Sequence, residues 1–191
     1  MSETKGSALS RYMGGRFDPI NKPLRGEIES KSGIELGQEM LGQLRLRDRV
    51  APGTILYRHI GGRNILKADN KEYGKKKGEK FRTGGECRDK AFMSCSKREE
   101  YITKAIAESS NKQHVFIITT SKNSKAHDVS DLRGNTEEAE VIYEPNTKFI
   151  ITSKGNRKFG KKTARVWYLT EQDEGLHRGS SKDEITVADL D

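Results

Sequence analysis

Cysteine is scarce in this 191-residue chain, which contains only Cys87 and Cys95. The pair forms no CxxC motif, and the sequence offers no set of four zinc ligands. A disulfide scaffold and a structural zinc site are therefore not indicated, and a reducing compartment is the simplest environment. We expect no metal in the chemistry of this protein.

Long apolar runs are also missing. No stretch approaches the roughly 20 apolar residues of a membrane span, and the N-terminal residues MSETKGSALSRYMGGRF hold no run of signal-peptide length. With glycine counted as apolar and tyrosine left out, such residues make up roughly 39% of the chain, below the usual level of about 45–50%. The sequence predicts a soluble protein with a modest core, no membrane contact and no cleavable secretion signal.

Basic residues outnumber acidic ones, with 36 Lys and Arg against 28 Asp and Glu, which gives a net charge of +8. Such a charge favours nucleic acid, an acidic protein surface or a phosphorylated cofactor as a partner. It serves equally well to keep a protein soluble. The lysine-rich stretch KKKGEK at 75–80 has the same two interpretations, a solvated loop or an anion site, so charge alone selects no function.

The length fits one domain, and the patterns divide the chain into three parts. Residues 1–32 have no sustained periodicity and are expected to form a flexible arm, 33–170 a single domain, and 171–191 a polar tail. Apolar spacing predicts a helix over 34–48 that stops before Pro52. A second helix is expected over 97–109, with Ser96 as its N-cap and Glu99 completing a capping box.

Short β-branched and aromatic runs predict strands, so that the domain belongs to the mixed α+β class. The run at 114–120 is apolar throughout and should be central in a sheet. Turn residues at 144–147 separate two strand-like runs and predict a β-hairpin. The expected strands cover 54–60, 92–94, 114–120, 138–143, 147–152 and 164–170.

Three short segments carry side chains that need a partner. Arg58 shares a strand face with Leu56 and Ile60, where a guanidinium requires an anion. That anion is either an internal carboxylate or a bound phosphate, whose geometry suits the guanidinium fork.

Glu138 and Glu140 are two residues apart in an expected strand, so their carboxylates should project from one face. Like charges at this spacing oppose each other unless a cation lies between them. The pair either faces solvent at a sheet edge or serves glycosidic-bond cleavage, whose oxocarbenium-like transition state carboxylates stabilise.

Ser94 and Ser96 either end a strand and cap a helix, or provide a hydroxyl that binds a ligand. Neither serine is a convincing nucleophile, because none of the four histidines lies in a triad context.

Taken in order, LYRH at 56–59, FMSCS at 92–96 and EEAEVIYEPNTKF at 137–149 resemble the motifs of mono-ADP-ribosyltransferases of the arginine-serine-glutamate class. Arg58 and Ser94 are separated by 36 residues, and Ser94 and Glu140 by 46, which is compatible with the order in that family. Cys95 departs from the usual Thr of the Ser-Thr-Ser motif. The resemblance covers about residues 54–170.

The resemblance implies a fold of two small, roughly perpendicular antiparallel sheets around an NAD cleft, with flanking helices. It implies that Arg58 contacts the phosphates and nicotinamide-side ribose of NAD, and that His59 offers its backbone to the carboxamide. Ser94 would orient that ribose and the catalytic glutamate. Glu140 would hold the ribose 2′-hydroxyl and stabilise the oxocarbenium ion, while Glu138 would orient or deprotonate the acceptor.

In this family Glu-x-Glu is associated with arginine acceptors, so the resemblance implies transfer of ADP-ribose from NAD to an arginine of a target protein. The loop SDLRGNT at 130–136 occupies the target-recognition position but lacks the aromatic residue that some members carry. The implied role is that of a bacterial toxin or effector, or a phage protein, acting in the cytoplasm of a target or host cell. An inhibitor or immunity protein would be a second partner.

Two other functions stay open at this point. An NAD glycohydrolase would use water in place of the acceptor. A basic nucleic-acid-binding protein would explain the charge, but aromatic residues make up only 7% of the chain and no RNA-binding aromatic motif or recognition helix is present. With nucleic acid as the ADP-ribose acceptor, Glu138 counts against modification of a base, although an RNA hydroxyl acceptor stays open.

Overall fold

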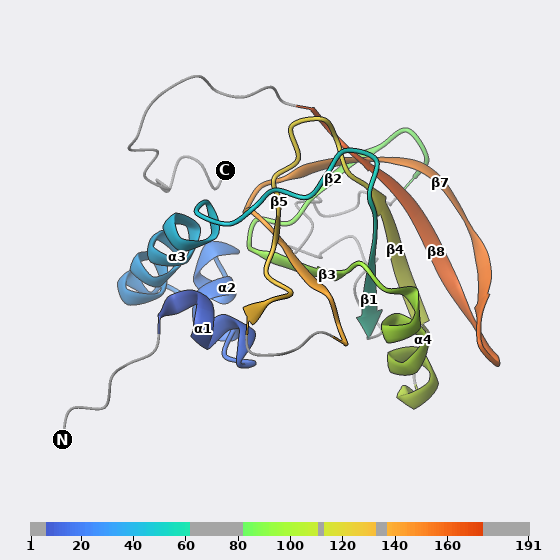
Figure 1. The fold of residues 1–191 in the computed structure, drawn as a ribbon, viewed down its shortest axis with the longest axis horizontal. Helices are drawn as coiled ribbons and strands as arrows, with labels where there is room; N and C mark the ends of the chain where they lie inside the picture. The colour runs from blue at the N-terminus through green and yellow to red at the C-terminus, as the bar shows by residue number, and fades with distance from the viewer. Residues whose placement is uncertain (1–6, 62–81, 111–112, 133–136, 174–191) are drawn as a thin grey trace.

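The structure is a computed structural model that describes residues 7–61, 82–110, 113–132 and 137–173 (Figure 1). The stretch at 75–80, the end of the loop at 130–136 and most of the expected tail lie outside these residues. The predicted mixed α+β class is confirmed, and within the described ranges no helix is long and apolar enough to cross a membrane. The elements in chain order are α1 (Ala8–Met13), α2 (Asp18–Leu24), α3 (Lys31–Leu44), β1 (Ile55–Gly61), β2 (Glu86–Arg88), β3 (Met93–Ser96), α4 (Glu99–Glu108), β4 (Gln113–Thr119), β5 (Ala126–Asp128), β6 (Glu140–Tyr143), β7 (Lys148–Phe159) and β8 (Lys162–Glu171).

The N-terminal segment differs from the expected flexible arm, because residues 8–24 form α1 and α2. The Ser7 hydroxyl caps α1 by accepting a hydrogen bond from the backbone N–H of Ser10 at 3.2 Å. With six and seven residues, these helices are too short to show a helical period, and their stability comes from packing. Their buried apolar side chains include Leu9, Tyr12, Ile20 and Leu24.

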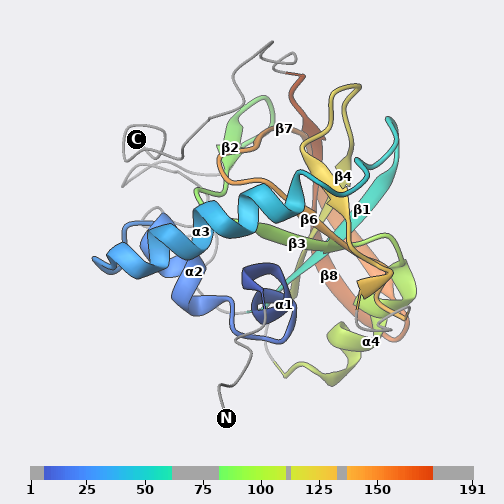
Figure 2. The same cartoon turned by 60° about the vertical axis from the view of Figure 1, so that its left-hand side comes forward.

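Helix α3 is confirmed as an amphipathic helix but occupies 31–44 in place of 34–48. It begins after Ser30, whose hydroxyl accepts from the Gly33 N–H at 3.1 Å, and it ends well before Pro52. A Cβ atom at Gly33 would lie 2.4 Å from the Pro23 side chain, so glycine allows α2 and α3 to pack closely. Helices α1 to α3 gather on one side of the molecule (Figures 1 and 2).

The strands form one sheet in the order β2-β7-β8-β4-β1-β3-β6-β5. All neighbours are antiparallel except β4 and β8, which run parallel. Strand β1 pairs with β4 along its whole length but with β3 only between Tyr57 and Ser96. The sheet therefore has a larger part, from β2 to β1, and a smaller part, from β3 to β5, joined at one pair. The two separate, wholly antiparallel sheets that the resemblance implied are thus one continuous sheet with one parallel pair.

The β-hairpin predicted around residues 144–147 is wrong. The turn exists, with Asn146 at a φ of 60°, but β6 pairs with β3 and β5 whereas β7 pairs with β2 and β8. The turn therefore carries the chain from the smaller to the larger part of the sheet. The hairpin is formed instead by β7 and β8, with Gly160 at a φ of 57° in their connection.

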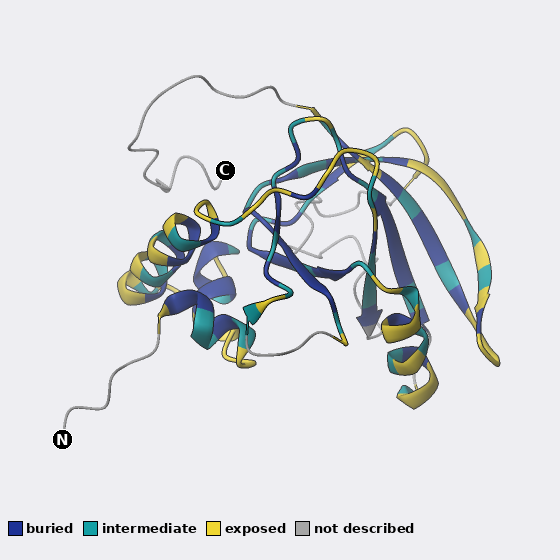
Figure 3. Ribbon diagram, viewed as in Figure 1, coloured by how far each residue is buried: buried dark blue, intermediate teal, exposed yellow. Residues whose placement is uncertain are grey.

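The core consists of three apolar clusters. The central one draws side chains from both parts of the sheet, so their inner faces pack against each other; it includes Leu56, Cys95, Phe116, Val141, Tyr143, Phe149 and Leu169. A second cluster joins α1 to α3 with Phe92 and Ile142, and a third packs α4 on Val115, Ile117 and Val166. As predicted, β4 is central, and its residues are mostly buried (Figure 3).

Candidate active site

Arg58 lies one residue beyond the single pair that joins β1 to β3. Its neighbours on the same face, Leu56 and Ile60, are buried as predicted. The half-buried guanidinium donates a hydrogen bond through Nη1 to the backbone oxygen of Ser94 at 2.7 Å. Two of the four predicted catalytic residues therefore meet where the two parts of the sheet separate.

Ser94 and Glu140 lie on one face of the neighbouring strands β3 and β6. Ser94 is opposite Ile142, and Ser96 is opposite Glu140. Because alternate residues of a strand project to the same side, Ser94 and Glu140 are diagonal neighbours on that face. The Ser94 hydroxyl is hydrogen-bonded to the Glu140 carboxylate. The structure thus brings these two residues together from distant positions in the chain.

The environment of Glu140 changes its proton affinity. Burial raises the pKa, the hydrogen bond from Ser94 lowers it, and the charge of Glu138 raises it again, so that the pKa lies at about 7. The residue is only 7% exposed. A carboxylate that is screened so little by water interacts strongly with a positive charge developing beside it.

Glu138 does not belong to the strand that carries Glu140, contrary to the prediction. Strand β6 begins at Glu140, and Glu138 lies in the preceding turn, where Ala139 adopts a left-handed φ of 47°. The two carboxylates are nevertheless close enough for the charge of Glu138 to raise the pKa of Glu140. Proximity of the acidic pair is therefore produced by a turn and not by the period of a strand.

The predicted capping role of Ser96 is also wrong. Helix α4 begins at Glu99, its N-cap position is Arg98, and no side chain caps it. The Ser96 hydroxyl instead donates to the backbone oxygen of Glu138 at 2.5 Å and accepts from the Arg98 N–H at 2.9 Å. Ser96 therefore holds the turn that presents Glu138.

His59 lies next to Arg58 on β1, and its side chain projects to the opposite face. Its Nε2 forms a close hydrogen bond with Oε1 of Gln113, at the start of β4. This contact fixes the imidazole away from Arg58. The predicted role of His59 in binding the carboxamide involves its backbone and stays a prediction.

Cys95, the departure from the family motif, faces the core and not the site. Its neighbours Ser94 and Ser96 project to one side of β3, so Cys95 projects to the other, where it is 3% exposed in the central cluster. Burial raises the pKa of its thiol to about 12. The thiol is thus a small apolar core group.

Tyr12 and Asn21 were missed by the sequence analysis. The buried Tyr12 hydroxyl donates to the backbone oxygen of Phe92 at 3.1 Å, and the Asn21 amide donates to that hydroxyl at 3.1 Å. Burial raises the pKa of Tyr12, while Asn21, the charge of Arg58 and a hydrogen bond with Ser94 lower it. Helices α1 and α2 therefore hold the strand segment that carries Ser94. No periodic pattern in the sequence predicted these helices.

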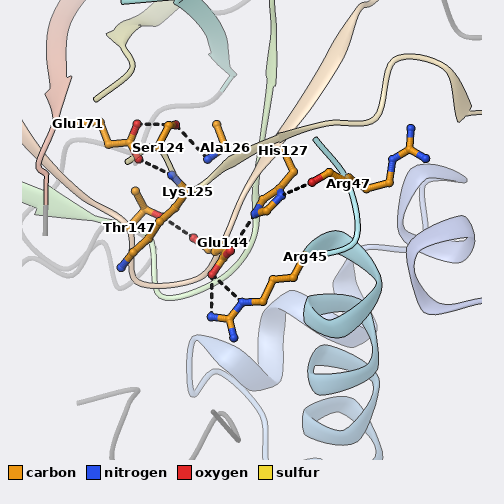
Figure 4. Close-up of polar contacts among 9 residues, drawn as sticks. All are labelled: Arg45, Arg47, Ser124, Lys125, Ala126, His127, Glu144, Thr147 and Glu171. Atoms are coloured by element: carbon orange, nitrogen blue, oxygen red, sulfur yellow. Dashed lines mark hydrogen bonds and ion pairs between the residues drawn. The ribbon is translucent and has the colours of Figure 1, made fainter. Parts of the chain in front are cut away.

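A polar network, in which Glu144 and His127 are buried and Arg45 is exposed, holds the end of β6 that is remote from Glu140 (Figure 4). Glu144 accepts hydrogen bonds from the Arg45 guanidinium at 2.9 and 3.2 Å and lies 2.8 Å from His127 Nε2. Burial raises the pKa of Glu144, but His127 and Arg45 lower it more, to about 2. In the same view, Glu171 at the end of β8 accepts from Ser124 and Lys125 and fixes the loop before β5.

A pocket of about 520 Å³ is lined by none of the predicted site residues. Its basic side chains are largely matched by acidic ones, since Lys97 pairs with Asp128 at 2.5 Å and Arg47 pairs with Asp131. Balanced charges of this kind give no attraction for a phosphate. The lining residues are Arg47, Asp48, Arg49, Val50, Ala51, Thr54, Lys97, Asp128, Ser130 and Asp131.

The site therefore combines a guanidinium at the join of the sheet, a buried carboxylate held by a serine hydroxyl, and a second carboxylate on the adjoining turn. A guanidinium suits a phosphate or diphosphate. A poorly solvated carboxylate suits a transition state with positive charge on a sugar carbon.

Comparisons with known proteins agree with this chemistry. The family model described as ADP-ribosyltransferase exoenzyme matches residues 1–173. A search of curated proteins found no match.

Among solved structures, the enzymatic component C2-I of the C2 toxin from Clostridium botulinum is 18% identical and has a TM-score of 0.63, over 88% of this chain and 42% of that chain. This chain thus spans less than half of C2-I.

Exoenzyme S from Pseudomonas aeruginosa, in complex with human 14-3-3 protein beta and bound to Carba-NAD, is 18% identical with a TM-score of 0.61, over 92% of this chain and 77% of that chain. Vis toxin from Vibrio splendidus is 17% identical with a TM-score of 0.63, over 91% of this chain and 75% of that chain. These structures share the fold, and the family match, which includes every described residue, shows that this chain belongs to the ADP-ribosyltransferase exoenzyme family.

Proposed function

We propose that this protein transfers ADP-ribose from NAD to an arginine side chain of a target protein and releases nicotinamide. The observation that carries the proposal is the acidic pair: Glu140 is buried and bonded to Ser94, and Glu138 lies close enough to raise its pKa. Two close carboxylates favour a cationic partner between them or beside them. A guanidinium acceptor is such a partner.

In the proposed reaction, Arg58 binds the diphosphate of NAD, and the backbone of His59 receives the carboxamide. Ser94 orients the nicotinamide ribose together with Glu140. The bond between the ribose C1′ and the nicotinamide nitrogen breaks, and nicotinamide leaves with the electron pair. Glu140 holds the 2′-hydroxyl and stabilises the oxocarbenium ion that forms.

The acceptor then completes the reaction at Glu138. A guanidinium nitrogen of the target arginine attacks C1′, a C–N bond forms, and the nitrogen gives up a proton. Glu138 orients the guanidinium and accepts that proton. The solved complexes of relatives with Carba-NAD and with agmatine, a guanidine, support NAD and a guanidine as the two substrates.

The similar structures include the enzymatic component of the C2 toxin from Clostridium botulinum and Vis toxin from Vibrio splendidus, which supports a role as a toxin or effector that acts on a protein of another cell. On this proposal the site of action is the cytoplasm of that cell. The acceptor is a protein with an exposed arginine.

The test is incubation of the protein with labelled NAD and a cell lysate. Wild type should label protein, Glu140→Gln should lose both labelling and nicotinamide release, and Glu138→Gln should lose labelling but keep part of the nicotinamide release. Full activity of Glu140→Gln would refute the mechanism. Nicotinamide release that does not rise when lysate is added would identify a glycohydrolase. Label found in nucleic acid would show that nucleic acid, and not a protein arginine, is the acceptor.

A further inference from the structure

An aromatic side chain outside the predicted motifs lies beside the acidic turn. Tyr101 belongs to the first turn of α4, which follows β3 directly. The turn that carries Glu138 is tied to this part of the chain by two hydrogen bonds, from the Ser96 hydroxyl to the Glu138 oxygen at 2.5 Å and from the Lys97 N–H to the Ala139 oxygen at 3.2 Å. The backbone therefore places Glu138 next to the start of α4.

The side chain of Tyr101 contacts Glu138 and keeps its ring at the surface. Its hydroxyl is hydrogen-bonded to the Glu138 carboxylate; burial, followed by the charge of Glu138, raises the pKa of Tyr101. The residue is 37% exposed, whereas Ile102 and Ile106 on the same helix are buried. Tyr101 is thus not one of the residues by which α4 packs on the sheet.

We propose that Tyr101 is a positioning residue that selects and orients the guanidinium of the acceptor. Its hydroxyl donates to Glu138 and so fixes the orientation in which the carboxylate accepts from the guanidinium. Its exposed ring offers a face on which a planar guanidinium stacks. The inference rests on the proposed function and assigns Tyr101 to the acceptor and not to NAD.

The experiment compares Tyr101→Phe with Tyr57→Phe. Tyr57 is a matched control, because its hydroxyl is hydrogen-bonded to Glu99 of α4, a glutamate outside the acidic pair. Each protein is given NAD with agmatine as the acceptor, and separately NAD alone. Agmatine modification reports on the acceptor step, and nicotinamide release from NAD alone reports on the remainder of the site.

For Tyr101→Phe we expect the KM for agmatine to rise about tenfold, the effect of losing a hydrogen bond to a charged group. Nicotinamide release from NAD alone should stay at the wild-type rate, and Tyr57→Phe should match wild type in both assays. Tyr101→Leu, which also removes the ring, should raise the KM further. A thermal melt should be the same for Tyr101→Phe and wild type.

Two results would overturn the inference: an unchanged KM for agmatine in Tyr101→Phe, or an equal loss of nicotinamide release from NAD alone. If wild type released nicotinamide but never modified agmatine, the guanidine acceptor itself would be wrong, and the role of Tyr101 with it. Wild-type modification of agmatine combined with an unaffected Tyr101→Phe would refute the role of Tyr101 alone.

Discussion

The Glu140 carboxylate should weaken the fold at neutral pH, so Glu140→Gln should stabilise the protein while it removes activity. In the folded chain the pKa of Glu140 is raised from 4.5 to about 7, chiefly by burial. A raised pKa favours the protonated folded state, so this contribution to stability is complete below pH 4.5 and is lost as the pH rises through about 7. At about 1.4 kcal/mol per pH unit, the loss reaches about 3 kcal/mol at pH 8.

Urea unfolding of wild type and Glu140→Gln at pH 4 and pH 8 measures this difference. Glutamine resembles the protonated acid, so the variant should be more stable by about 3 kcal/mol at pH 8 and nearly equal to wild type at pH 4. Glu144→Gln is a control whose free energy of unfolding should change in the opposite direction. It should be less stable than wild type, because the substitution weakens the bonds with Arg45 and His127. A Glu140→Gln protein that is no more stable than wild type at pH 8 would refute the reasoning.

Three other variants test separate parts of the site. Ser94→Ala removes the bond that lowers the pKa of Glu140, so the acidic limb of kcat/KM for NAD should move to higher pH; an unmoved limb would contradict the assignment. Cys95→Thr restores the family residue but buries a hydroxyl in the core, so the free energy of unfolding should fall by about 1–3 kcal/mol with the KM for NAD unchanged; a changed KM would place Cys95 in the site. The lowered pKa of Glu144 supplies stability that is lost as the pH falls from 4.5 through about 2. Acid unfolding of Glu144→Gln should lack this loss. If the variant and wild type lost stability identically, the network would be excluded as the source.

The sequence predicted Arg58, Ser94 and Glu140 as site residues, because three motifs in order along the chain resemble those of a known family, and the structure places these residues together. Their contact was not predictable from local patterns. It depends on the β3–β6 register and on the single pair between β1 and β3.

The predictions that failed did so for identifiable physical reasons. Turn residues at 144–147 indicate that the chain reverses, but they do not determine whether the strands on either side pair with each other. The left-handed φ of Ala139, a non-glycine residue, ends the strand before Glu138 and is invisible to a period-two pattern. Tyr12 lies in a helix of six residues that is stabilised by tertiary packing, so no period identified it.

The central claim is that the acceptor is an arginine held at Glu138 while Glu140 acts on NAD. Its most direct test is mass spectrometry of the proteins that become modified when wild type acts on a lysate with NAD, mapping the atom that carries ADP-ribose. The account predicts modification on arginine side chains, lost in both Glu140→Gln and Glu138→Gln. Modification on asparagine, cysteine or nucleic acid, or arginine modification that persists in Glu138→Gln, would contradict it.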